Sequence, residues 1–249
     1  TYTNSFDNGN HNLTATAGFT TYYNSLSRLD GARKQGVGLV IPNDPDKWFV
    51  SIGDAATATN GSTQWERTTV SMLARVIYNY KGKYLFNGSF RRDGSSAFSY
   101  TGNQWQNFYS VGAGWLMSEE EFMKDAREWL TNLKLRASYG NLGNQSALND
   151  YYPWMNNYDL SAKYPFGGSL QPGYYQKNYK IATISWEKAR TWGVGFDATL
   201  LDKVTVAFDY YDRKTTGIIM DVPVPPEFGL GAYKDNVGSM VNRGMELTV

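Results

Sequence analysis

Residues 191–200 read Thr-Trp-Gly-Val-Gly-Phe-Asp-Ala-Thr-Leu, and every second residue of this stretch is apolar. Successive side chains of a β-strand point to opposite faces, so an extended chain separates the two sets. One face then carries Trp192, Val194, Phe196, Ala198 and Leu200. The other face carries only small or polar side chains. The stretch therefore predicts a strand with one apolar face and one small or polar face.

The same alternation returns along the whole chain, in segments longer than the five or six residues typical of soluble strands. A tilted strand needs about nine to eleven residues to cross a bilayer. We expect about nine strands, near residues 1–6, 12–23, 63–80, 84–91, 108–117, 133–140, 186–201, 204–211 and 236–249. The pattern predicts an all-β fold: an antiparallel up-and-down transmembrane β-barrel, present as part of a larger barrel.

The connections between these strands alternate between short and long, as in outer-membrane barrels with short periplasmic turns and long outer loops. Short connections are expected at 7–11, 81–83 and 202–203, with a compact one at 119–132. The longer ones are expected at 24–62, 94–106, 144–185 and 216–235.

The compact connection departs from the two-residue rhythm. Ser118 and Glu121 have the spacing of a capping box, in which each side chain bonds a free backbone N–H of the first helical turn. Apolar residues then follow at intervals of three and four. We expect one short amphipathic helix near residues 119–130.

Composition narrows the function. The 24 Lys and Arg balance 23 Asp and Glu, so no bulk charge attracts nucleic acid. The chain has no cysteine and one histidine, His11, so we expect no metal site, no cofactor and no catalytic triad, and hence no enzyme. The 19 tyrosines suit the water–lipid boundary, but they suit a sugar-binding surface equally well. A secreted carbohydrate-binding β-sandwich therefore stays open as the alternative.

The placement of charges favours the membrane. On the alternation, five charged side chains fall on the polar faces of their strands: Arg75, Lys134, Arg136, Asp197 and Asp209. A Lys or Arg facing lipid at the bilayer midplane costs about 2–4 kcal/mol, so a barrel wall excludes charges from its apolar face.

Several motifs, in this order and spacing, resemble the barrel of the SusC/RagA transporters, TonB-linked outer-membrane proteins of Bacteroidetes-type bacteria. They are RRDGSSAF at 91–98, SVGAGW at 110–115, LKLRASYG at 133–140, SWEK at 185–188, DYYDRKT at 209–215, and NVG with NRGMEL at 236–238 and 242–247. The resemblance covers roughly residues 12–249 and misses mainly the long loops.

The resemblance implies a 22-stranded barrel in the outer membrane of a Gram-negative bacterium, with an N-terminal plug and energy supplied through the TonB complex. It implies a SusD-like surface lipoprotein as partner and oligosaccharide or peptide cargo. The sequence shows neither plug nor signal peptide nor closing strand, so we expect residues 1–249 to be part of the barrel domain, an internal or C-terminal-half fragment.

Five side chains are candidates for contact with cargo or partner. Aromatic rings stack on sugars, and the loop residues Trp154, Tyr174 and Tyr175 offer such rings, although they equally suit packing within the loops. Arg91 and Arg92 lie at a strand end, where we expect ion pairs with Asp93 or contact with cargo at the rim.

Overall fold

The computed structural model describes residues 1–38, 40–100, 102–148, 151–176 and 183–249. The remaining positions belong to the expected long connections and lie outside the described residues. The chain divides into two compact units, one of Thr1–Tyr22 with Thr69–Val249 and one of Tyr23–Thr68.

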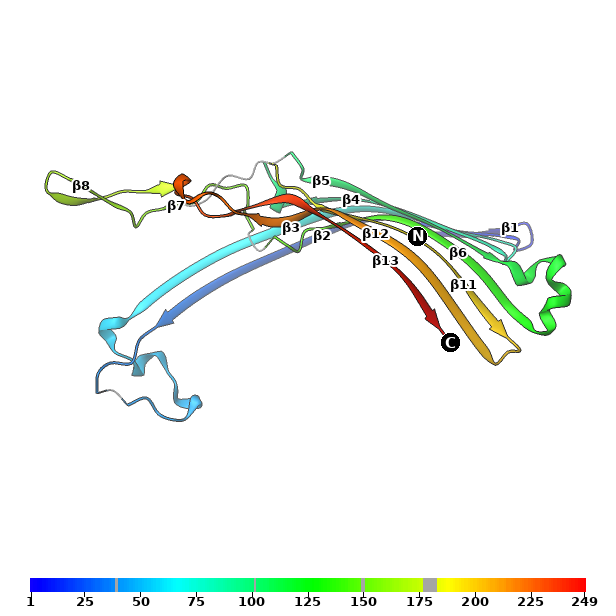
Figure 1. Ribbon diagram of the computed structural model, residues 1–249, viewed down its shortest axis with the longest axis horizontal. Helices are drawn as coiled ribbons and strands as arrows, with labels where there is room; N and C mark the ends of the chain where they lie inside the picture. The colour runs from blue at the N-terminus through cyan, green and yellow to red at the C-terminus, as the bar shows by residue number, and fades with distance from the viewer. Residues whose placement is uncertain (39, 101, 149–150, 177–182) are drawn as a thin grey trace. The chain divides into compact units, whose positions relative to one another are not determined.

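A nine-stranded antiparallel sheet dominates the structure, as predicted, with its strands in the order β1-β2-β3-β4-β5-β6-β11-β12-β13 (Figure 1). The strands are β1 Tyr2–Phe6, β2 His11–Ala32, β3 Thr59–Tyr80, β4 Tyr84–Ser95, β5 Trp105–Leu116, β6 Leu130–Asn144, β11 Glu187–Leu200, β12 Val204–Val222 and β13 Tyr233–Thr248. Neighbours in the sheet are neighbours along this series, which is the up-and-down order that the sequence predicts.

Tight turns join the strands where the sequence predicts short connections. Lys81 and Gly82 have φ values of 54° and 69°, and the Lys83 N–H donates to the Tyr80 carbonyl at 3.0 Å. Positive φ at both central residues is the type I′ geometry, whose twist matches that of the flanking strands. The β11–β12 turn has the same geometry, but its central residues are Leu201 and Asp202, one position earlier than expected.

The unit Tyr23–Thr68 holds the far parts of β2 and β3 and the segment between them. We expected a loop over 24–62, but β2 continues to Ala32 and β3 already begins at Thr59. Most side chains of these extensions are polar or exposed, so the apolar alternation that marks the other strands is absent here. The described part of the connection contains three short 3-10 turns: η1 Pro45–Lys47, η2 Val50–Ile52 and η3 Ala55–Thr57.

Two other connections contain more regular structure than expected. β4 continues through Asp93 to Ser95, where the sequence predicted a break, and η4 Ser96–Phe98 follows it. The described part of the 144–185 connection holds two small antiparallel sheets. Their strands are β7 Tyr158–Asp159 with β10 Tyr175–Gln176, and β8 Lys163–Phe166 with β9 Ser169–Pro172.

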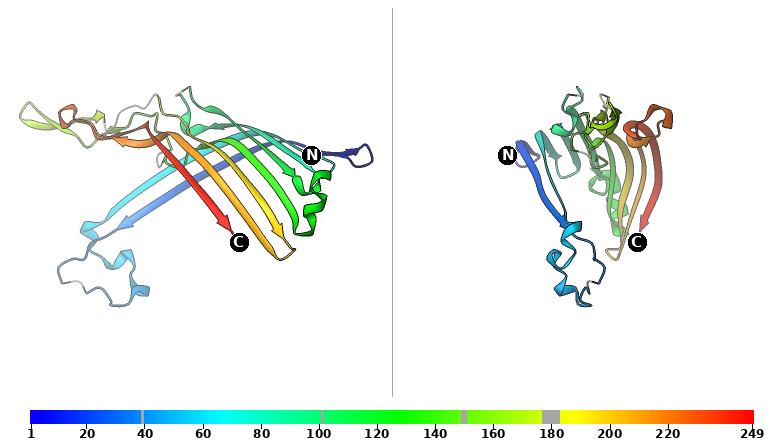
Figure 2. Two further views of the ribbon diagram at one scale, coloured as in Figure 1. Left: turned by 45° about the vertical axis from the view of Figure 1, so that its right-hand side comes forward. Right: turned by 90° about the vertical axis from the view of Figure 1, so that its left-hand side faces the viewer.

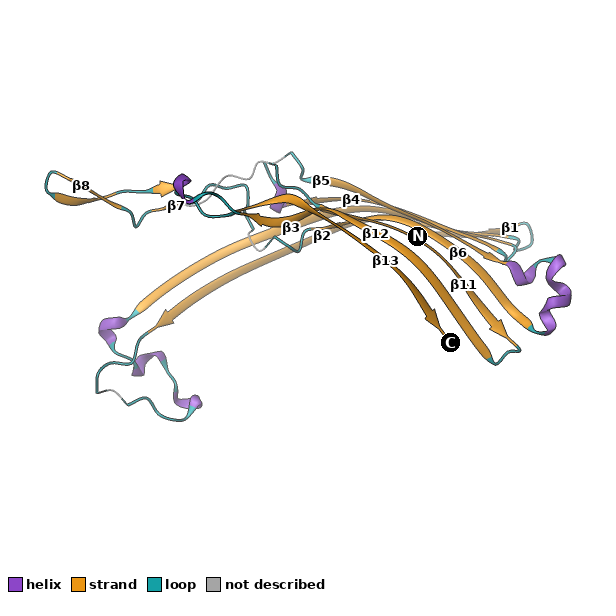
Figure 3. Cartoon of the chain, viewed as in Figure 1, coloured by secondary structure: helices purple, strands orange, loops and turns teal. Residues whose placement is uncertain are grey.

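A short helical segment lies between β5 and β6, as expected, but the predicted capping box is wrong. The segment consists of 3-10 turns, η5 Met117–Glu119 and η6 Glu121–Glu128, the second beginning after Glu120 without a side-chain cap (Figure 3). The Ser118 carbonyl accepts a hydrogen bond from Arg127 Nε at 2.6 Å, and Glu121 pairs with Lys124. The Glu121 carboxylate therefore pairs with Lys124 instead of a free backbone N–H. Among the described residues, no helix has the length and apolar character needed to cross a bilayer.

Strands β4 to β13 of the large sheet lie in a single layer (Figure 2). Its apolar face is not covered: Val194 is 46 % exposed and Leu247 is 67 % exposed. In a β-sandwich the two apolar faces pack together, whereas the other two sheets found in the described residues have only two strands each. The sandwich alternative is therefore wrong.

The buried core of the described residues lies at the loop end of the sheet. Trp186 contacts Phe98 and Phe108, with ring centroids 5.1 Å and 5.7 Å apart. The remaining buried members of this cluster are Ala97, Leu148, Ile184 and Ile219. The cluster anchors the bases of the long connections.

Candidate functional site

The polar face of the sheet is hollowed because glycines line it. A Cβ atom at Gly195 would collide with the Phe208 carbonyl oxygen, and one at Gly112 would lie 2.8 Å from the amide nitrogen of Asn87. Neighbouring strands and side chains thus fill the space that a larger residue needs. The alternating glycines of β5 and β11 contribute no side-chain atoms to this face of the sheet.

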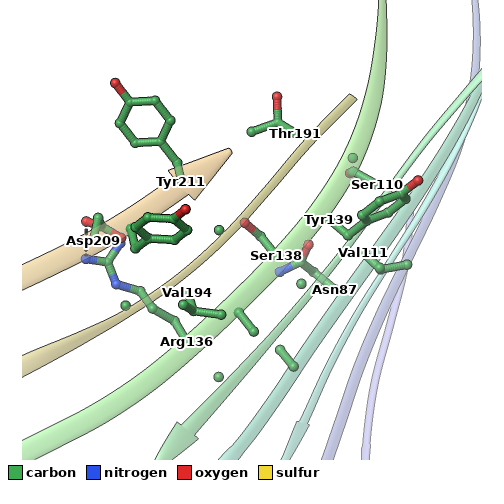
Figure 4. Close-up of a pocket in the computed structure, with 18 of the residues that line it drawn as sticks. Asn87, Ser110, Val111, Arg136, Ser138, Tyr139, Thr191, Val194, Asp209 and Tyr211 are labelled. Atoms are coloured by element: carbon green, nitrogen blue, oxygen red, sulfur yellow. Dashed lines mark hydrogen bonds and ion pairs between the residues drawn. The ribbon is translucent and has the colours of Figure 1, made fainter. Parts of the chain in front are cut away.

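This hollow has a volume of about 610 Å³ and crosses β4, β5, β6, β11, β12 and β13 (Figure 4). Its polar lining comes mainly from Asn87, Ser110, Arg136, Ser138, Thr191, Asp209, Tyr211 and Glu246. Amides, hydroxyls and charges of both signs are hydrogen-bonding groups for a polar ligand or for water.

An ion-pair network across three strands organises this hollow. Arg136 on β6 lies 3.1 Å from the Asp197 carboxylate on β11 and 2.7 Å from that of Asp209 on β12. All three side chains are more than one-third exposed, so solvent screens these pairs. The network confirms the prediction that these charges share the polar face.

A second hollow of about 380 Å³ lies nearer the long connections, between β4, β5 and β6. Arg91 lines it, with Nε 2.6 Å from the Asp93 carboxylate and a second nitrogen donating to Ser71 Oγ at 3.0 Å. Ser71 and Asp93 are buried. The expected ion pair at this strand end is confirmed for Arg91.

The SWEK and NVG motifs meet at the loop end of β11 and β12. Gly217 there has a φ of 65°, and the pairing of β12 with β13 shifts register beside it. Asn236 donates to the Gly217 carbonyl at 2.7 Å, and Glu187 accepts from the Ile219 N–H at 2.9 Å and from Asn144 at 2.7 Å. Side chains thus bond the backbone groups that the irregular pairing leaves free.

At the opposite end, Glu120 joins the short 3-10 segment to the sheet. Its carboxylate accepts from the Tyr84 hydroxyl at 2.7 Å, from Trp115 Nε1 at 3.1 Å and from Lys83 Nζ at 3.2 Å. The bond from Tyr84, with those from Trp115 and Lys83, lowers the pKa of the Glu120 carboxyl. Glu120 therefore stays ionised at neutral pH.

The structure separates the five predicted contact residues. Arg92 lies on the apolar face, opposite to Arg91, and its guanidinium sits over the Trp105 ring at 5.5 Å from the centroid. Trp154 packs against Tyr100 and Tyr152 in a loop.

Tyr174 packs edge-on against Tyr158 and stays 73 % exposed, whereas Tyr175 pairs with Asp159 in the small β7–β10 sheet. Loop packing thus accounts for Trp154 more fully than for either tyrosine.

The site residues that sequence reasoning missed are the uncharged ones, such as Asn87, Ser138 and Tyr211. The alternation places each on the polar face of its strand. However, only the strand register shows that they meet, with Ser138 opposite Gly193 and Gly193 opposite Tyr211.

The chemistry of the hollow is that of a water-facing, hydrogen-bonding surface. Within the described part of the chain, no group of three His, Cys, Asp or Glu side chains is placed to hold a metal ion. The charged groups Arg136, Asp197 and Asp209 form ion pairs with one another.

Comparison with known proteins agrees with this geometry. The TonB-dependent receptor SusC of Bacteroides thetaiotaomicron is 36 % identical over 193 residues, which cover 73 % of this chain and 18 % of SusC. The TonB-dependent receptor P3 of Formosa agariphila is 32 % identical to this chain. The match covers 100 % of this chain and 24 % of P3. The chain thus spans about a quarter or less of these relatives.

Among solved structures, the RagAB peptide transporter is similar, with a TM-score of 0.79 and 26 % sequence identity. The match covers 99 % of this chain and 26 % of the matched RagAB chain. The siderophore receptor PirA of Acinetobacter baumannii shares the fold alone, with a TM-score of 0.55 and 9 % identity. The profile of one family, TonB dependent receptor-like, beta-barrel, matches residues 1–249. The chain therefore belongs to this family of β-barrels of the Gram-negative outer membrane, and within it is similar to SusC and RagAB.

Proposed function

We propose that this chain is a wall segment of a TonB-linked outer-membrane transporter that imports oligosaccharides or peptides. Family membership supports outer-membrane transport in general. The similarity to SusC and to the RagAB peptide transporter supports the narrower proposal about the cargo.

The observation that carries the proposal is the contrast between the two faces of one sheet. The polar face holds a 610 Å³ hollow with the Arg136 network, and the other face exposes Trp192, Val194 and Leu247. A barrel wall needs this contrast, with lipid outside and water inside.

The proposal includes two partners. A SusD-like surface lipoprotein would meet the long connections, and the TonB complex would act through a plug in the remainder of a longer protein. The similarity to SusC and RagAB supports both. We also propose that the chain has no enzymatic activity, since its relatives are named as receptors and transporters.

For cargo contact we favour Tyr174, Tyr175 and Arg91 among the five predicted residues. The two tyrosines are exposed at the long 144–185 connection, and Arg91 lines the second hollow. Trp154 and Arg92 are less suited, because Trp154 packs against two aromatic rings and Arg92 lies on the apolar face over the Trp105 ring.

Uptake in the native host tests this function. A strain that lacks the full-length gene should lose uptake of one fluorescently labelled cargo class, oligosaccharide or peptide, and the restored gene should recover it. Arg136→Ala should reduce that uptake several-fold at equal surface abundance, because it leaves two carboxylates unpaired in the hollow. Lys203→Ala, at the short β11–β12 turn, serves as the control.

Unchanged uptake of both classes in the deletion strain would overturn the proposal. The lipoprotein partner is tested separately: it should co-purify with tagged full-length protein from detergent-extracted outer membranes.

A further inference from the structure

Three cations stand together on the apolar face of the sheet, at the loop end of β11 and β12. Lys188 and Arg190 lie on the same face of β11 as Trp192, because the three positions are two residues apart. Lys214 on β12 is the cross-strand partner of Arg190. All three side chains are exposed. We call Lys188, Arg190 and Lys214 the cationic cluster.

No carboxylate of the described residues neutralises the cationic cluster. Like charges directly opposite one another in a sheet destabilise it, and Arg190 faces Lys214 in this way. The nearest acidic position on this face of β12 is Asp212, which is already paired with Arg243 at 2.5 Å. In the part of the chain that the structure describes, none of the three cations has an ion-pair partner. An arrangement that costs stability without a partner points to an external anion.

The cluster also has a shaped site beside it. A hollow of about 350 Å³ is lined by all three cations and by Tyr109, Tyr139, Asn141 and Thr216. The Tyr109 and Tyr139 rings stack with centroids 6.2 Å apart. This hollow joins three cations and several hydrogen-bonding groups to the aromatic edge of the apolar face.

The depth of the cluster places it at a lipid headgroup. Arg190 is ten residues from Leu200, which adjoins the short β11–β12 turn. At about 3.4 Å per residue this is about 34 Å along the strand, or about 26 Å along the membrane normal for a tilt near 40°. The apolar band of such barrels is about 25 Å tall. The cluster thus lies just past the hydrocarbon, on the side of the long outer loops.

We propose that the cationic cluster binds the phosphate groups of lipid A, the membrane anchor of lipopolysaccharide in the outer leaflet. This inference rests on the proposed function, since it needs the apolar face to contact lipid. Arg and Lys form charge-assisted hydrogen bonds to phosphate oxygens. Lipopolysaccharide fills the outer leaflet of the Gram-negative outer membrane, so its phosphates meet the wall at this height.

The test measures lipid A binding by full-length protein in nanodiscs of neutral lipid. Wild type should bind phosphorylated lipid A roughly a hundredfold more tightly than K188Q/R190Q/K214Q does. Each cation removed should lower the affinity by a factor of about five. Dephosphorylated lipid A should bind wild type as weakly as phosphorylated lipid A binds the variant. Millimolar inorganic phosphate should not compete. The matched control K81Q/K203Q/R213Q removes three exposed cations elsewhere and should bind like wild type.

Without lipid A, the triple variant should be as stable to heat as wild type or more so, because it removes like-charge repulsion. Equal lipid A binding by wild type and K188Q/R190Q/K214Q would overturn the inference. It would also be overturned if wild type bound phosphatidylglycerol as tightly as phosphorylated lipid A. Failure of the proposed function would differ from both results, because it would appear as unchanged cargo uptake in the deletion strain, which the lipid A binding assay does not measure.

Discussion

At the scale of single residues, stability depends on polar side chains at the two ends of the sheet. These side chains form hydrogen bonds with backbone groups or with the polar atoms of aromatic side chains. Glu187 and Asn236 act at the loop end, and Glu120 acts at the turn end. The sequence shows Glu187 and Asn236 as parts of motifs and Glu120 as a residue of the expected helix. It does not show most of their partners, because these lie on segments 19 to 51 positions away.

Glu120 should make stability depend on pH. Its pKa is lowered in the folded protein, so ionised Glu120 stabilises the fold at neutral pH. This contribution is present above the pKa of an unfolded glutamate, about 4.3, and is lost as the pH falls through the lower folded value. In detergent at pH 7, the full-length wild-type protein should have a higher midpoint temperature of thermal unfolding than Glu120→Gln. This difference in midpoint temperature should disappear in acid. A gap that is constant from pH 7 to pH 3 would contradict this role.

Glu187 should stabilise the loop end. Glu187→Ala leaves the Ile219 N–H and the Asn144 amide without their acceptor. Loss of a buried partner costs about 1–3 kcal/mol, so the midpoint of thermal unfolding should fall. Glu187→Gln keeps one acceptor oxygen and should recover part of the loss. Equal stability of wild type and Glu187→Ala would show that water replaces these bonds.

At the scale of strands, the two-residue alternation predicted the order, the faces and the short turns of the large sheet. It did not predict the far parts of β2 and β3, because strands without an apolar face lack the pattern. The sequence also predicted a helix capped by Ser118 and Glu121 where 3-10 turns without that cap form, and Glu121 pairs with Lys124 instead. The polar hollow was predictable as a face, but its boundaries depend on cross-strand register.

Glycine spacing on the polar face should be needed for strand pairing. Gly195→Ala places a methyl group against the Phe208 carbonyl and the Asp209 side chain, so we expect a loss of about 1–3 kcal/mol. Gly88→Ala, on the apolar face of β4, meets only the Phe86 ring at 3.6 Å and should be nearly neutral. Urea unfolding from liposomes compares the two variants. Equal losses of stability in the two variants would contradict the claim that limited space requires glycine at position 195.

At the scale of the whole molecule, strands β4 to β13 of the large sheet present one polar face and one apolar face. The polar face offers hydrogen-bonding groups, while the apolar face and its cationic border match the hydrocarbon and headgroup regions of a bilayer. This division follows from alternation within each strand and from nothing that a single residue contributes. It is therefore the feature of the fold that the sequence predicts best.

Nitroxide scanning of residues 191–200 in full-length protein in liposomes tests this division most directly. The chain has no cysteine of its own, so single cysteines introduced there carry the label, once any elsewhere in the protein are replaced. Collision rates with oxygen, which concentrates in lipid, should peak at 192, 194 and 196, and those with a water-soluble nickel chelate should peak at 191, 193 and 197. Two profiles that rise and fall together, without a period of two, would contradict the account.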